Sequence, residues 1–154
     1  MNSEYDRKLS ESDARAICCE FFKEVMQKTE GMIRLGELTS AERTAALVMQ
    51  VTGLAINMGL DGLLSDEIDE DPGYSESIKA FDRINAKWAA GILREGLAIK
   101  AHLAATGAKD DSEKLLYDLE GEFYELEPDC ITKLALFILR LKNSPALGRG
   151  KPVS

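Results

Sequence analysis

Acidic side chains gather in two segments of the sequence, and their number and spacing suggest a use. Residues 61–78 hold seven acids and no base, and residues 110–129 hold nine acids and one base. These 38 residues carry a net charge of −15, whereas the other 116 residues, with 11 acids and 18 bases, carry +7. Unopposed carboxylates repel one another and lower stability. Two such runs therefore favour a surface that binds a basic partner, with a solvated helix face as the simpler alternative.

Helical spacing within the second segment indicates how such a surface would be built. Four of its acids are spaced by four, three and four residues: Asp118, Glu122, Glu125 and Asp129. On a continuous helix these side chains would share one face. They would form a row resembling, at lower density, the phosphates of duplex DNA, which carries about one charge per 1.7 Å of axis. Gly121 and Pro128 fall inside the row and argue against a continuous helix.

We predict a partner-binding surface made from both acidic segments. Its predicted residues are Asp66, Glu67, Asp69, Glu70, Asp71, Asp118, Glu120, Glu122, Glu125 and Glu127.

Residues typical of catalytic or metal sites do not form a pattern. The only histidine, His102, cannot make a histidine-rich zinc site, and we expect a surface or hydrogen-bonded side chain. Cys18 and Cys19 are adjacent and so do not form a CxxC motif. We expect Cys130 to be a packed thiol, although a place in the first turn of a helix would lower its pKa. The sequence predicts a non-enzymatic protein with no cofactor and no metal, with a carboxylate metal site or an enzyme as the less favoured alternative.

Length, composition and charge narrow the class of protein further. The chain has 154 residues, 45% of them hydrophobic, which is enough for one domain with a real core. A net charge of −8 argues against direct binding to nucleic acid or acidic membranes. The first 13 residues contain no apolar signal segment, and the apolar stretch 131–141 is too short to span a membrane. Three cysteines do not make a disulfide framework, so we expect a cytoplasmic protein.

Apolar residues recur at helical spacing along almost the whole chain. Helix start signals are Ser10 with Asp13, the Thr39–Glu42 capping box, and prolines 72 and 128. No segment alternates with period two. The pattern predicts an all-α, single-domain bundle of five or six helices over residues 1–144, with a flexible tail over 145–154. The predicted core residues are Trp88, Ile92, Phe123, Leu134 and Ile138.

Three stretches of the sequence resemble a known protein family. Residues 55–64 resemble its V-x-N-G-G-F-x-Q-F-F element, with Asn57, Gly59 and three leucines in matching places. Residues 116–126 resemble its F-D-E-L-D-D-E-F-Y-x-L element, and residues 77–90 resemble a helix pair between the two. The family consists of small acidic all-helical proteins and includes a DNA mimic that binds, as a dimer, to a helix-turn-helix transcription factor.

The resemblance and the charge pattern together suggest a function. The resemblance implies an all-helical fold and a DNA-like acidic surface, and a homodimer could follow as well. Our hypothesis is an acidic DNA mimic that occupies the DNA-binding surface of a transcription factor or another basic protein. The alternative is an immunity protein that neutralises a basic toxin such as a nuclease, because the same electrostatics would serve it.

Overall fold

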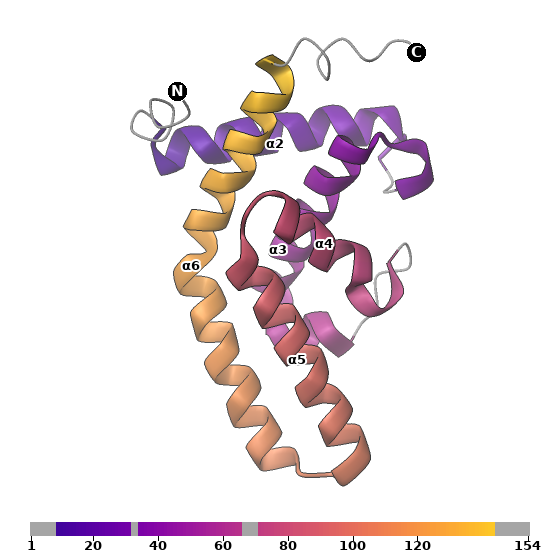
Figure 1. The fold of residues 1–154 in the computed structure, drawn as a ribbon, viewed down its shortest axis with the longest axis vertical. Helices are drawn as coiled ribbons and strands as arrows, with labels where there is room; N and C mark the ends of the chain where they lie inside the picture. Colours follow the sequence, from indigo (N-terminus) through magenta and orange to yellow (C-terminus); the bar gives the residue numbers. More distant parts are fainter. Residues whose placement is uncertain (1–8, 32–33, 66–70, 144–154) are drawn as a thin grey trace.

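The computed structural model describes residues 9–31, 34–65 and 71–143, which form a bundle of five α-helices without strands (Figure 1). The α-helices are α2 (Glu11–Lys28), α3 (Ser40–Ser65), α4 (Ser75–Arg83), α5 (Lys87–Thr106) and α6 (Lys109–Asn143). Two short 3-10 helices, Leu35–Glu37 and Pro72–Tyr74, precede α3 and α4. The predicted all-α single-domain bundle is confirmed. The predicted flexible tail, residues 145–154, lies outside the described residues.

Side-chain caps begin the first two helices where the sequence predicts them. The Ser10 hydroxyl accepts a hydrogen bond from the backbone N–H of Asp13 at 3.0 Å. Thr39 and Glu42 form a reciprocal capping box, in which each backbone N–H donates to the other side chain at 3.0 and 3.1 Å. These bonds satisfy amide groups that have no partner within the helix.

Helix α6 is one continuous element of 35 residues, so the predicted helix start at Pro128 is wrong. Pro128 lies inside α6 and lacks the N–H that would bond to the carbonyl of Tyr124. Buried side chains anchor the helix on both sides of the proline, among them Phe123 and Ile131. Packing of these residues holds the helix together across the missing bond, and Gly121 does not interrupt it either.

The long helix α6 forms the spine of the bundle. In Figure 1, α2 crosses its C-terminal end and α5 runs antiparallel beside its N-terminal half, and α3 also packs against it. Four of the five predicted core residues are at most 4% exposed: Ile92, Phe123, Leu134 and Ile138. The fifth, Trp88, is only partly buried; its ring lies edge-on to Phe123, with centroids 5.7 Å apart.

Helix α3 is long and apolar enough to cross a membrane when judged by length and composition alone. The core helix of a globular protein passes the same test. In this structure α3 packs against α2, α4, α5 and α6, and its buried residues include Leu47, Val48 and Val51. It occupies the place of a core helix.

Candidate protein-binding surface

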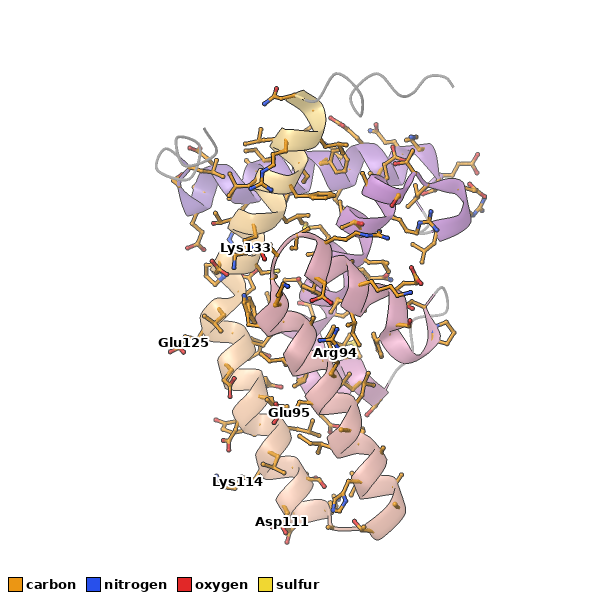
Figure 2. The ribbon with its side chains drawn as sticks, viewed as in Figure 1. Arg94, Glu95, Asp111, Lys114, Glu125 and Lys133 are labelled. Carbon is orange, nitrogen blue, oxygen red and sulfur yellow. The ribbon has the colours of Figure 1, made fainter. Side chains whose placement is uncertain are left out.

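Continuity of α6 places four carboxylates on one face of the helix. We call this row the α6 ridge: Asp118, Glu122, Glu125 and Asp129. All four residues are exposed, and Figure 2 shows Glu125 pointing away from the bundle. With a rise of 1.5 Å per residue, the ridge is about 16 Å long and offers one carboxylate per roughly 5 Å. It is sparser than a DNA strand, which presents one phosphate per about 3.4 Å of axis.

Among the described residues, lysine side chains form ion pairs with the carboxylates at the two ends of the ridge but not with those at its centre. Lys114 lies 3.6 Å from Asp118, and Lys133 lies 3.0 Å from Asp129, each one helical turn away. The Lys114 pair is highly exposed, so solvent screens it. Within the described parts of the chain, neither Glu122 nor Glu125 forms an ion pair. The middle of the ridge therefore remains available to a positively charged partner.

Exposed aromatic and aliphatic side chains occur in the same stretch of α6 as these carboxylates. Tyr117 is 74% exposed, Tyr124 is 42% exposed and Leu126 is 37% exposed. The Tyr124 hydroxyl donates a hydrogen bond to the carbonyl of Ala55 at 3.2 Å. Partial burial, with the nearby charge of Glu120, raises the pKa of Tyr124. Tyrosine is enriched at protein interfaces. The charge pattern of the sequence does not indicate these residues, although they lie within residues 116–126, which carry the family resemblance.

Glu120, predicted as a partner-binding residue, is instead tied to helix α3. Its carboxylate accepts a hydrogen bond from the backbone N–H of Leu60 at 2.7 Å. The preceding residue, Gly59, has φ +77°, and a Cβ built there would lie 2.6 Å from the Glu120 carboxylate. Only glycine adopts this conformation easily and leaves room for the carboxylate. Glu120 thus caps the start of the helical segment of α3 that follows the kink at Gly59.

Glu127, a second predicted partner-binding residue, is buried and already paired. Its side chain is 7% exposed and receives two hydrogen bonds from the guanidinium of Arg15, at 2.9 and 2.5 Å. These bonds are the main reason that the pKa of Arg15 is raised, while Glu11 adds a smaller contribution. The prediction of a surface role for Glu127 is wrong, because the side chain joins α6 to α2.

Asp71 is also buried, at 3% exposure, and it caps α4 rather than facing solvent. Its carboxylate accepts hydrogen bonds from the backbone N–H groups of Glu76 and Ser77 at 2.9 and 2.7 Å. It accepts a third from the Ser77 hydroxyl at 2.7 Å. The other predicted residues of the first segment, Asp66, Glu67, Asp69 and Glu70, lie outside the described residues. In the part that the structure describes, the candidate surface therefore consists of the α6 ridge.

The thiols and the histidine have ordinary structural settings. Cys18 and Cys130 are buried, and burial raises the pKa of each to about 12, which makes them poor nucleophiles. Cys130 lies in the middle of α6, so no helix terminus lowers its pKa. His102 is exposed on α5. No group of three His, Cys, Asp or Glu side chains suited to a metal ion occurs in residues 9–31, 34–65 and 71–143.

Comparison with known proteins identifies a family. The family model described as "DMP19-like protein" matches residues 36–141, more than half of the chain. The match spans the three stretches that carry the sequence resemblance, and it confirms that resemblance. No curated protein and no solved structure matched the chain.

Proposed function

We propose that this chain, which belongs to the DMP19-like protein family, is an acidic protein that occupies the DNA-binding surface of a basic protein. The family includes a DNA mimic. The observation that carries the proposal for this chain is the α6 ridge, whose carboxylates stand on one face of a continuous helix. The carboxylates are negatively charged, like DNA phosphates, and they are arranged in a row. A basic surface that binds the phosphates of a DNA strand could therefore bind the ridge in their place.

Electrostatic cost supports a binding role for the ridge. Glu122 and Glu125 are exposed and have no cation partner among the described residues, so nothing in that part of the chain relieves their mutual repulsion. Two other carboxylates of the second acidic segment, Glu120 and Glu127, are instead used within the fold. A partner carrying lysine and arginine would neutralise the ridge, accelerate association and make binding sensitive to salt.

The neighbouring tyrosines favour a protein partner over a purely ionic one. Tyr117 and Tyr124 are exposed, and they neighbour Asp118 and Glu125 of the ridge in the sequence. An arginine that pairs with Glu122 or Glu125 could also stack on such a ring, since guanidinium groups bind both carboxylates and aromatic faces. We therefore expect arginine-rich DNA-binding surfaces to bind more tightly than lysine-rich ones of equal charge.

Capture of the partner from lysate of the native cell tests the proposal. The ridge variant combines Asp118→Asn, Glu122→Gln and Glu125→Gln. A matched control makes the same change in net charge on α2, through Asp13→Asn, Glu20→Gln and Glu24→Gln, which are also exposed. The wild type and the control should retain the same DNA-binding protein, and the ridge variant should lose it.

Duplex DNA provides the second arm of this experiment. Added duplex should release the captured protein from the wild type, because both ligands would occupy one surface. The proposal would be wrong if the ridge variant retained the protein as well as the control does. It would equally be wrong if the captured protein bound duplex and the wild type at the same time.

A further inference from the structure

A cavity lies between the C-terminal third of α6 and the turn that joins α4 to α5, away from the centre of the ridge. Its volume is about 340 Å³. The turn contributes Ile84 and Asn85, and α6 contributes side chains spaced along one face. The α6 residues that complete its wall are Thr132, Lys133, Leu136 and Arg140, together with Asp129. Figure 2 places Lys133 on α6 at the height of this turn.

The wall of the cavity carries one positive charge in excess. Lys133 is 3.0 Å from the Oδ2 atom of Asp129, and the same oxygen accepts a hydrogen bond from the indole N–H of Trp88 at 3.1 Å. Arg140 makes no ion pair or side-chain hydrogen bond with any described residue. Two cations and one carboxylate therefore leave the wall at +1, although the chain as a whole carries −8.

Polar and apolar groups divide the wall between them. Ile84 and Leu136 are 3% and 8% exposed and offer an apolar floor. The amide of Asn85 and the hydroxyl of Thr132 are hydrogen-bonding groups beside the two cations. A small cavity with an apolar floor and a few polar groups at one side is the usual form of a site for a small organic molecule.

We propose that this cavity binds a small organic carboxylate. Its carboxylate group pairs with the guanidinium of Arg140, which can donate two parallel hydrogen bonds, and its apolar part covers Ile84 and Leu136. The excess charge of +1 matches a monoanion, whereas a phosphate dianion would leave uncompensated negative charge beside Asp129. A neutral molecule of the same shape would leave Arg140 unpaired.

Tryptophan fluorescence can test the site directly, because Trp88 is the only tryptophan in the chain and bonds to the cavity wall at Asp129. The probe is hexanoate, compared with hexanol, hexylamine and inorganic phosphate at the same ionic strength. Hexanoate should change the fluorescence saturably below about 10 mM, and each of the other three compounds should bind at least about tenfold more weakly. Amide NMR shifts of Asn85 and Thr132 on titration should report the same affinity.

Two variants on the last turns of α6 complete the test. Arg140→Gln should weaken hexanoate binding at least about tenfold, the loss of a charge-assisted pair. Lys142→Gln removes the same charge from the same helix outside the cavity and should leave the affinity unchanged within about twofold. Both residues are exposed, and thermal melts of each variant confirm folding. The proposal is overturned if hexanoate does not bind, if hexanol or phosphate binds as tightly, or if both variants respond alike.

Discussion

The carboxylate of Glu120 on α6 accepts a hydrogen bond from the backbone N–H of Leu60 on α3, at 2.7 Å. Leu60 follows the kink at Gly59, where φ is +77° and the helical hydrogen-bonding pattern restarts. The N–H groups after such a kink resemble those at a helix start and need acceptors. Glu120, although part of the acidic segment, thus stabilises the neighbouring helix α3. Its carboxylate is used within the fold.

Replacement of Glu120 should therefore affect stability. Glu120→Ala removes the acceptor for the Leu60 N–H, and loss of a capping side chain costs about 0.5–2 kcal/mol. Glu120→Gln keeps an oxygen acceptor and should cost less than the alanine variant. Urea unfolding of both variants measures the difference. Equal stability of the alanine variant and the wild type would show that the Leu60 N–H has another acceptor.

The pair of Arg15 and Glu127 should contribute more than the surface carboxylates near it. Glu127→Gln replaces a carboxylate that is 7% exposed with a neutral amide, so the Arg15 guanidinium loses its charged partner on α6. We expect the free energy of unfolding to fall by about 1–3 kcal/mol. Glu125→Gln, two residues away and exposed, is the matched control and should change stability by less than about 0.5 kcal/mol. Thermal or urea unfolding measures both. A control as destabilised as Glu127→Gln would contradict this assignment.

Glu42 should make part of the stability depend on pH. Burial of its carboxylate opposes ionisation, but hydrogen bonds from Lys28 and Thr39 outweigh burial and hold the pKa of Glu42 below its ordinary value. A carboxyl group whose pKa is lower in the folded state contributes stability above its unfolded pKa, and loses that contribution as the pH falls through the folded pKa. Glu42→Gln retains capping ability but not the charge.

Unfolding of this variant across pH therefore has a defined outcome. At pH 7 Glu42→Gln should be less stable than the wild type by at most about 1 kcal/mol, since Lys28 is half exposed. The difference should vanish below the folded pKa, where the wild-type carboxyl is also neutral. A difference that stays constant from pH 7 to pH 3 would show that the charge of Glu42 does not contribute.

The sequence predicts the fold well because the apolar repeat and the caps are local signals. The Thr39–Glu42 capping box and the core positions of Phe123 and Ile138 follow from spacing alone. The helix start predicted at Pro128 is wrong, because packing of the α6 residues before and after the proline outweighs its local preference for the first turn of a helix. Local propensity cannot report that packing, which joins residues far apart in the chain.

The candidate site is harder to predict, since an acidic residue looks the same in sequence whether it faces solvent or a distant partner. Glu127 is separated from Arg15 by 112 residues, and Glu120 from Leu60 by 60. Glu122 and Glu125, within the same run, remain exposed. Helical spacing identifies the ridge correctly only when α6 is known to be continuous, which the sequence argues against.

Competition with DNA tests whether the α6 ridge occupies the DNA-binding surface of the partner. The captured DNA-binding partner is bound to its own labelled duplex, and the anisotropy of the label is followed as this protein is added. We expect the wild type and the α2 control to displace the duplex with equal potency, and the ridge variant Asp118→Asn, Glu122→Gln, Glu125→Gln to be at least about tenfold weaker. Added salt should weaken the wild type more than the ridge variant. Displacement by the ridge variant with unchanged potency and salt dependence would show that the α6 ridge does not bind this surface.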